Sequence, residues 1–465
     1  MPVDLTKTFS WSSADADGLE MLADLQCNIL KGHGRRATRH LFLQFVDKEQ
    51  AASFLRKIEP MVTSSLEQLR QNQRRKLAGI SGGPVLCVYL AAKGYEFLGR
   101  SGKMPQVADG GAFAQGMKAR AGALADNPDH LEERYRKDFH AKLLIAGDPD
   151  DDSTWTSETV DKLETVILNM MQGAATVVAS EAGRAIFNTH GDGLEHFGYV
   201  DGRSQPLLLV EDVEAEKAMS GIDKWDPAFP LSQVLVADPG GAGSNSFGSF
   251  FVFRKLEQNV KGFNETEEDL GDTLGLGELA GAMLVGRFED GTPVELSDHD
   301  GLNAPIPNNF NYHQDKDGSR CPFHAHIRKT NPRGESAVLF GIPEAEERAH
   351  IMARRGIPFG RRDRIVDPSD LPSGGVGLLF MAHQGNIQNQ FEFTQATWAN
   401  NPGFLQPGTG KDPIIGQPLP PSSLSHFTKW NDPAAPRKQA DFGGFVTHKG
   451  GEYFFAPAKS MLRSV

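Results

Sequence analysis

The segment Arg39-His40-Leu41-Phe42-Leu43-Gln44-Phe45-Val46 first alternates between polar and apolar residues and then becomes continuously apolar. This pattern is typical of a strand that is buried in a protein core. The residues that follow it, 48–72, carry leucines at helical spacing and predict a helix. Further along, the pattern predicts a strand at 85–90, a short helix at 93–98, a strand at 140–146, a helix after the turn at 148–153 and a strand at 175–179. This order of strands and helices is the split βαβ pattern of a ferredoxin-like unit.

The second half of the chain repeats this plan less clearly. Two long connections rich in proline and glycine, 286–320 and 401–440, are too extended for idle loops, so we expect them to wrap a ligand or an oligomer partner. Between and around them the pattern predicts strands at 250–253, 349–354 and 377–383, a helix at 387–398 and a last strand at 453–457.

The composition indicates a soluble globular protein. Of the 465 residues, 39% are hydrophobic, which is enough for a sizeable core. No run approaches the roughly 20 apolar residues of a membrane span, and the first 17 residues lack the layout of a secretory signal. Three cysteines, Cys27, Cys87 and Cys321, agree with a reducing compartment and predict no disulfide framework. We therefore expect a cytoplasmic protein that does not contact a membrane.

The charge excludes one class of partner. A formal net charge of −12 disfavours nucleic acid, because binding a polyanion requires clustered cations. An acidic surface favours neutral or cationic small molecules as substrates.

The segment from Cys321 to Arg333 is the most chemically dense part of the chain, with two histidines, a thiol and three cations. If it is extended before Pro332, then His324, His326 and Arg328 lie on one face. A basic surface loop and a zinc site formed by Cys321, His324 and His326 are two interpretations. The tight spacing and the absence of a second Cys/His cluster argue against zinc. A haem site needs only one axial histidine and cations for the propionates, which fits the segment most economically.

Three segments carry a family resemblance. His326-Ile-Arg-Lys-Thr-Asn-Pro-Arg333 resembles the proximal haem segment of dye-decolorising peroxidases. Phe197-Gly-Tyr-Val-Asp-Gly-Arg-Ser-Gln-Pro206 is similar to the distal Gly-x-x-Asp-Gly signature of the same family. Gln26-Cys-Asn-Ile-Leu-Lys-Gly-His33 resembles its N-terminal motif, with Cys27 in place of a glycine. The resemblance spans about residues 22–457 and is nearest to the longer bacterial type without a signal peptide.

This resemblance implies a fold and a cofactor. The fold is α+β, with two ferredoxin-like halves that form a dimeric α+β barrel-like haem protein. Residues 1–210 would form the half that carries the distal aspartate motif, and residues 211–465 the half that carries the proximal histidine and the distal arginine. The implied cofactor is haem b, iron protoporphyrin IX.

On the distal side, the resemblance assigns the acid/base role to Asp201. Gly198 and Gly202 would allow a tight turn close to the porphyrin, where a Cβ atom would collide. The segment 351–360 resembles the strand of the distal arginine, which stands four residues before a proline, and this places the role on Arg354. Arg355 is the alternative, and strand alternation allows only one of the two to face the haem.

On the proximal side, the resemblance makes His326 the iron ligand, with His324 as the alternative. Arg328 would pair with a haem propionate. Glu392 is the predicted acceptor for the second N–H group of the imidazole, by resemblance to a family segment. Leu378 and Phe380 alternate on an apolar strand and are predicted to line the distal pocket.

The resulting prediction is a haem peroxidase that reduces hydrogen peroxide and oxidises aromatic donors, such as dyes and phenolics, by one-electron steps. It predicts the highest activity at acidic to mildly acidic pH. Bulky donors would be oxidised through surface tyrosines or tryptophans. Two rivals remain, a haem-binding or iron-handling protein without strong turnover and a cytochrome ligated through Cys321-Pro322. The sequence also leaves a homo-oligomer open.

Overall fold

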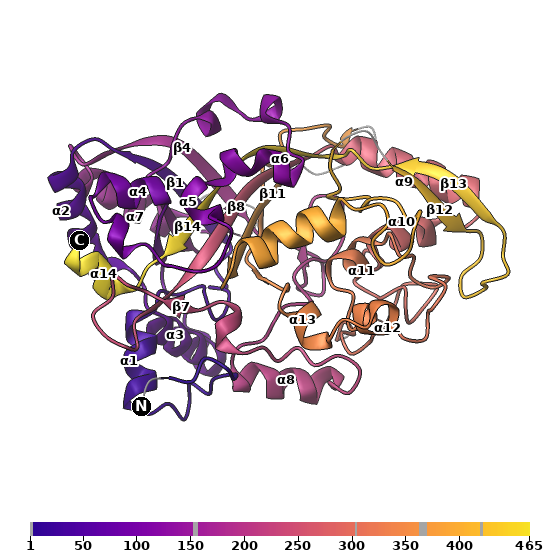
Figure 1. Cartoon of the computed structure of the whole chain (residues 1–465), viewed down its shortest axis with the longest axis horizontal. Helices are drawn as coiled ribbons and strands as arrows, with labels where there is room; N and C mark the ends of the chain where they lie inside the picture. The colour runs from indigo at the N-terminus through magenta and orange to yellow at the C-terminus, as the bar shows by residue number, and fades with distance from the viewer. Residues whose placement is uncertain (1–2, 152–156, 303–304, 362–369, 419–421) are drawn as a thin grey trace.

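The main strands of the chain close into a β-barrel, which lies in the left half of Figure 1. The computed structural model describes residues 3–151, 157–302, 305–361, 370–418 and 422–465. Within these residues, the barrel strands run in the order β8-β14-β2-β3-β1-β4-β10-β11, and β11 pairs again with β8. All of these pairs are antiparallel. The barrel strands are β1 (Ala37–Phe45), β2 (Val85–Leu90), β3 (Ala141–Gly147), β4 (Ala175–Arg184), β8 (Phe247–Gln258), β10 (Ile357–Phe359), β11 (Gly377–Gln384) and β14 (Val446–Ala456).

Shorter strands and the helices surround the barrel. The remaining strands are β5 (Ile186–Phe187), β6 (Gly193–Leu194), β7 (Val236–Ala237), β9 (Ala353–Arg354), β12 (Ser422–Phe427) and β13 (Arg437–Phe442). The helices are α1 (Ala16–Asp24), α2 (Lys48–Ile58), α3 (Ser65–Ala78), α4 (Ala92–Phe97), α5 (Ala112–Gln115), α6 (Ala121–Leu124), α7 (Glu158–Met170), α8 (Val210–Ser220), α9 (Val260–Leu274), α10 (Glu278–Val285), α11 (His326–Thr330), α12 (Glu335–Phe340), α13 (Glu344–Arg348) and α14 (Lys459–Ser464).

The barrel combines two ferredoxin-like units. One unit has the strand order β2-β3-β1-β4 and the other β14-β8-β11-β10. The units meet at two narrow seams, where Phe455 pairs with Leu90 and Phe359 pairs with Gly183. The predicted α+β class with two ferredoxin-like halves is therefore confirmed. The boundary of the halves near residue 210 stays a prediction.

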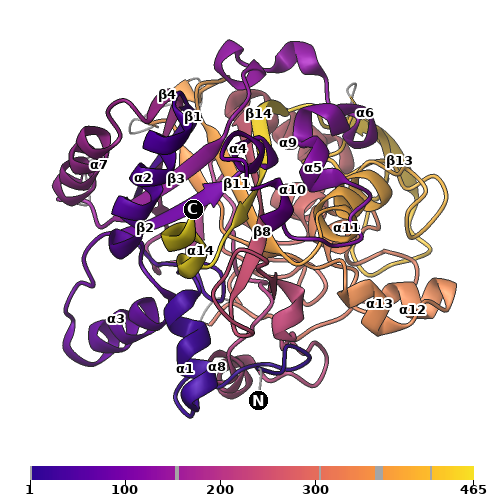
Figure 2. The same ribbon diagram turned by 60° about the vertical axis from the view of Figure 1, so that its left-hand side comes forward.

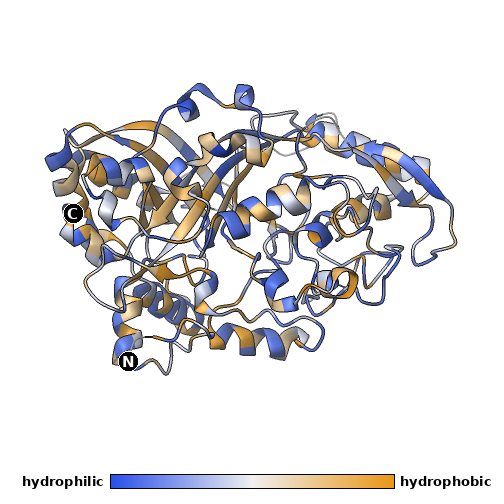
Figure 3. Cartoon of the chain, in the orientation of Figure 1, coloured by the Kyte–Doolittle hydropathy of each residue, from blue (hydrophilic) through white to orange (hydrophobic). Residues whose placement is uncertain are grey.

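Both faces of the central strands are buried. Every residue of β2 and β3 is buried, because one face fills the barrel and the other is covered by helices. Inside, Phe42 packs edge-on against Phe253, and outside, Leu41 belongs to the same cluster as Phe54 of α2. Helices α2 and α7 cover this outer face (Figure 2). The strands accordingly form the most hydrophobic region of the ribbon (Figure 3).

One element of the first half differs from its prediction. The single helix expected at 48–72 is two helices, since α2 ends at Ile58 and α3 begins at Ser65. Pro60 sits in a short 3₁₀ turn between them, where its ring disfavours a continuous α-helix. Ser64 then caps α3 by accepting a hydrogen bond from the backbone N–H of Glu67.

The second unit carries long insertions, which lie beyond one end of the barrel on the right of Figure 1. They include α9 to α13 and the hairpin of β12 and β13. The helix predicted at 387–398 is present but is π-helical, over Gln388–Glu392 and Thr394–Ala399. Such wide turns often occur near functional sites. No helix in the described part of the chain is long and apolar enough to span a membrane.

Candidate active site

A large cavity lies between the open end of the barrel and the insertions. It encloses about 1630 Å³ of space between atoms, part of which is open to solvent. Its polar lining brings together Asp201, Arg354 and His326. The two long connections contribute to the wall through Arg287 and Ile414, as expected for segments that wrap a ligand. Apolar wall residues include Ile327, Met352, Leu378, Phe380, Ile415 and Val446.

Asp201 and Arg354 form an ion pair at the cavity. Arg354 Nη1 lies 3.1 Å from Asp201 Oδ1, and Nη2 donates to the Ser204 carbonyl at 3.1 Å. The backbone N–H of Arg354 donates to Gln205 Oε1 at 3.0 Å, so strand β9 is also fixed to the loop of Asp201. Both charged side chains are about one-third exposed, 33% for Arg354 and 34% for Asp201, and small molecules in the cavity can therefore reach them.

The glycines of the Asp201 loop adopt the conformations that require glycine. Gly202 has φ +84° and lines the cavity, where an added Cβ would meet no described atom within 4 Å. Gly198 has φ +111°, does not line the cavity, and would bring a Cβ to 3.0 Å from Glu289 Oε1. Both residues thus form the predicted turn, but Gly198 lies away from the cavity wall.

The neighbouring arginines Arg354 and Arg355 point to different places. Arg355 Nε donates to the Asn28 carbonyl at 2.8 Å, and its Nη2 donates to the Ile29 carbonyl at 2.9 Å. Arg355 therefore anchors the N-terminal segment, whereas Arg354 lines the cavity. This arrangement agrees with the expectation that only one of the two faces the site.

His326 begins the short helix α11 and is fixed by a carboxylate. Its Nδ1 lies 2.8 Å from Asp412 Oδ2, and Asp412 Oδ1 accepts hydrogen bonds from the backbone N–H groups of Ile414 and Ile415. Burial lowers the pKa of His326, but the charge and hydrogen bond of Asp412 outweigh it and raise the pKa overall. Burial raises the pKa of the Asp412 carboxyl, but His326 and the backbone N–H groups of Ile415 and Ile414 together outweigh burial and lower it overall. No other side chain in the described ranges bonds to Nε2 of His326, which therefore remains available.

The segment around His326 is not extended, although the sequence predicts that it is. The prediction that His324, His326 and Arg328 lie on one face is therefore also wrong. Residues 326–330 are helical, and successive residues of a helix are about 100° apart, so His326 and Arg328 point in nearly opposite directions. His324 does not line the cavity either. Its ring packs against that of His426 with a centroid distance of 4.9 Å.

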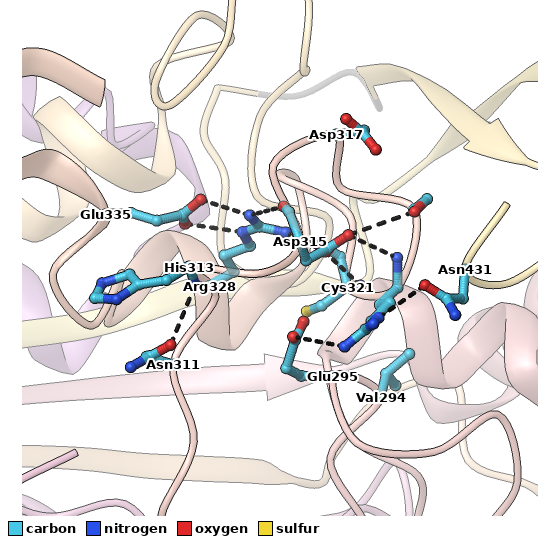
Figure 4. Close-up of polar contacts among 12 residues, drawn as sticks. Val294, Glu295, Asn311, His313, Asp315, Asp317, Cys321, Arg328, Glu335 and Asn431 are labelled. Atoms are coloured by element: carbon cyan, nitrogen blue, oxygen red, sulfur yellow. Dashed lines mark hydrogen bonds and ion pairs between the residues drawn. The ribbon is translucent and has the colours of Figure 1, made fainter. Parts of the chain in front are cut away.

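The prediction that Arg328 contacts a haem propionate is wrong, because Arg328 has a structural role away from the cavity. Its side chain is fully buried and outside the cavity lining. Its guanidinium lies between two carboxylates (Figure 4). It contacts Asp315 Oδ2 at 2.7 Å and Glu335 at 2.5 and 2.8 Å, and it also donates to the carbonyl of Cys321.

We expect Arg328→Met to lower the free energy of unfolding by about 3–5 kcal/mol, because it leaves two buried carboxylates without their cation. Urea unfolding measures this loss. Arg320→Met is the matched control, because Arg320 lies in the segment just before α11, is partly exposed and is 3.5 Å from its partner Glu295, a longer contact than those of Arg328. Normal stability combined with weakened haem binding would restore the propionate role.

Glu295, beside this cluster, links stability to pH. Burial raises the pKa of its carboxyl from 4.5 to about 8. The folded protein therefore holds this proton more tightly than the unfolded chain does. Between pH 4.5 and 8 the unfolded chain loses the proton first, so stability falls as pH rises, by up to about 1.4 kcal/mol per pH unit.

Glu295→Gln should flatten this decline, since glutamine stays neutral throughout. The midpoint of thermal unfolding, measured across the same pH range, tests this, with the exposed Glu278→Gln as control. An equally steep decline in the Glu295→Gln variant would show that other groups cause it.

The predicted partner of the imidazole, Glu392, is also wrong. Its carboxylate pairs with Arg120 at 2.6 and 2.9 Å and accepts a hydrogen bond from the Tyr453 hydroxyl at 2.9 Å. The acceptor is instead Asp412, which lies in the connection 401–440. The local pattern Gly-Lys-Asp-Pro around Asp412 resembles an ordinary turn, so no sequence signal marked it.

Other predicted and unpredicted residues also meet at the cavity. Leu378 and Phe380 line it, as expected from strand β11. Two buried arginines, Arg287 and Arg333, line it without having been predicted. Burial lowers the pKa of Arg287 to about 9 and that of Arg333 to about 10.

These arginines lack the partners expected of buried cations. Among the described residues, Nη2 of Arg287 has no hydrogen-bond partner. Within the same part of the chain, the guanidinium of Arg333 donates hydrogen bonds only to neutral acceptors, on Asn308, Phe310 and Ser204. Two buried guanidinium groups without a carboxylate partner indicate that an anionic group belongs beside them.

Comparisons with known proteins agree with this geometry. Residues 24–185 match the family model of the DyP dimeric alpha+beta barrel domain. Over 480 aligned residues, which cover 100% of both chains, the protein is 45% identical to the multifunctional dye peroxidase DyP2 of an Amycolatopsis species. The chain belongs to the dye-decolorising peroxidase family. The family resemblance and the enzyme class read from the sequence, a peroxidase, are thereby confirmed, and peroxidases of this family depend on haem.

Solved structures of relatives extend the agreement to the whole fold of the peroxidase. The structure of DyP2 from Amycolatopsis superimposes with a TM-score of 0.92, at 44% identity and 100% coverage of both chains. A DyP-type peroxidase from Anabaena matches with a TM-score of 0.88 at 39% identity, covering 96% of this chain and 94% of the other. A dye-decolorising peroxidase in complex with 2,6-dimethoxyphenol matches with a TM-score of 0.77 at 27% identity, covering 96% and 99%.

Proposed function

We propose that the peroxidase binds haem b in this cavity, reduces hydrogen peroxide there and oxidises aromatic donors, such as dyes and phenolics, by one-electron steps. The observation that carries the proposal is that Asp201, Arg354 and His326 line one cavity with apolar walls. The donor class is supported by relatives, of which one is named a dye peroxidase and another was solved with a phenol.

The cavity fits haem by its own chemistry. His326 offers Nε2 as an iron ligand, because Nδ1 is held by Asp412. Leu378, Phe380 and the other apolar wall residues suit the face and edges of a porphyrin. The guanidinium groups of Arg287 and Arg333, which have no carboxylate partner among the described residues, would bind the propionates in place of Arg328. Bound haem would supply the redox-active iron that hydrogen peroxide oxidises by two electrons.

Asp201 would move the proton of the substrate. Its carboxylate accepts a proton from one oxygen of hydrogen peroxide and returns it to the other oxygen, which leaves as water. Arg354, 3.1 Å from Asp201, stabilises the negative charge that develops on the departing oxygen. The Asp412 carboxylate orients the His326 imidazole and increases its basicity by accepting the Nδ1–H bond.

Steady-state oxidation of 2,6-dimethoxyphenol and of an anthraquinone dye by the haem-loaded protein tests this proposal. The rate should saturate with hydrogen peroxide, and two donor molecules should be oxidised for each peroxide, because each gives one electron. A protein that retains haem but turns over no faster than free haem would instead be a haem-binding protein.

A further inference from the structure

Two of the three cysteines form a close pair outside the lining of the active-site cavity. Cys27 Sγ and Cys87 Sγ are 3.2 Å apart, although 60 residues separate them in the chain. Both side chains are fully buried, and both residues belong to the cluster that fills the barrel. The third cysteine, Cys321, is buried in a separate small cluster. All three are free thiols in this structure.

The surrounding backbone holds the two thiols in contact. The backbone N–H of Cys27 donates to the Thr63 carbonyl at 2.9 Å. Gln26, the residue before Cys27, exchanges two hydrogen bonds of 2.8 Å with the main chain of Val88, the residue after Cys87. The segment of Cys27 and strand β2 are therefore joined directly beside the cysteine pair. A closure of roughly 1 Å would bring the sulfurs to disulfide bonding distance.

We propose that Cys27 and Cys87 form a disulfide when the enzyme is exposed to hydrogen peroxide, its own substrate. One thiolate attacks a peroxide oxygen, giving a sulfenic acid and hydroxide. The second thiol then displaces the hydroxyl group of the sulfenic acid as water, and the S–S bond forms. In total, two thiols and one hydrogen peroxide give one disulfide and two waters, so peroxide is the only oxidant required.

The environment of the pair makes this reaction slow at neutral pH. The hydrogen bond to Cys87 and burial both raise the pKa of the Cys27 thiol. Because the thiolate is the reactive form, attack by Cys27 on peroxide is slow under ordinary conditions and becomes faster as pH rises. The disulfide would therefore accumulate during prolonged exposure to peroxide instead of switching within one turnover.

The bond would stabilise a segment that supports the active site. Asn28 and Ile29, directly after Cys27, accept the hydrogen bonds that anchor Arg355 beside Arg354. A disulfide would tie this segment to β2 and close a 60-residue loop. Closing such a loop restricts the unfolded chain, and we expect the apparent midpoint of thermal unfolding to rise by about 5 °C.

Mass spectrometry of the holoenzyme tests the proposal directly. The haem-loaded protein is incubated with excess hydrogen peroxide at about pH 7 and about pH 9, denatured, alkylated and digested. We expect a linked pair of peptides that contain Cys27 and Cys87, formed faster at the higher pH, while Cys321 is alkylated. The Cys321→Ala variant should form the same link, and the Cys87→Ala variant should form none and lose the thermal shift.

Two results would overturn the proposal. One is complete alkylation of all three cysteines after prolonged exposure. The other is oxidation of Cys27 and Cys87 to separate sulfinic or sulfonic acids without a linked peptide. The measurement on the unaltered protein decides the matter even where a variant fails to fold, and it does not depend on which donor the enzyme oxidises.

Discussion

Replacing Asp201 by asparagine should lower the rate of peroxide turnover by about 10²- to 10⁴-fold while haem stays bound. The amide cannot accept the proton of hydrogen peroxide, whereas its size and its place beside Arg354 are nearly unchanged. Steady-state rates normalised to haem content measure the effect.

Arg354→Leu should have a related effect, a loss of about 10²- to 10³-fold, because the charge on the departing oxygen loses its fixed cation. Asp192→Asn is the matched control for both variants. Its carboxylate lies just before β6, nine residues from Asp201, accepts a hydrogen bond from Asn188 and does not line the cavity. Full activity in the Asp201→Asn variant would refute the acid/base role of that residue.

Replacing His326 by alanine should remove most of the bound haem from the purified protein. His326 lines the cavity and offers Nε2 as an iron ligand, since Nδ1 is held by Asp412. The ratio of haem absorbance to protein absorbance measures this loss. Haem content equal to that of the unaltered protein would favour another ligand, such as His324 or Cys321.

The variant Asp412→Asn separates the orienting group from the ligand. It should keep its haem but lose roughly 10- to 100-fold in activity, because the imidazole loses its anionic hydrogen-bond acceptor. Glu392→Gln is the matched control. The sequence predicts Glu392 for this role, but its carboxylate pairs with Arg120 and not with His326. A larger effect in Glu392→Gln than in Asp412→Asn would contradict the assignment.

The first half of the fold was predictable because each of its strands coincides with a short, regular run of apolar residues. Residues 85–90 were predicted as a strand and form β2, and 140–146 nearly coincide with β3. The break at Pro60 was missed because the helical leucine pattern continues across it. The closure of the barrel could not be predicted from local patterns. It depends on two seams between the units, and each seam consists of a single residue pair.

The site was predictable where a motif carried it. The loop of Asp201, the segment of His326 and the choice of Arg354 over Arg355 all came from the resemblance, while strand alternation indicated only that one of the two arginines faces the site. Arg328 was placed wrongly because residues 326–330 were interpreted as a strand, in which His326 and Arg328 would share one face. In the helix that forms instead, these two side chains point in nearly opposite directions. Asp412 could not be found because its contact joins residues 86 positions apart through an irregular loop.

The central claim is that Asp201, Arg354 and His326 enclose one haem. A crystal structure of the haem-loaded enzyme, with anomalous diffraction measured at the iron edge, tests it most directly. We expect a single iron peak inside the cavity, within bonding distance of Nε2 of His326. An iron peak outside this cavity, or one ligated by His324 or Cys321, would contradict the account.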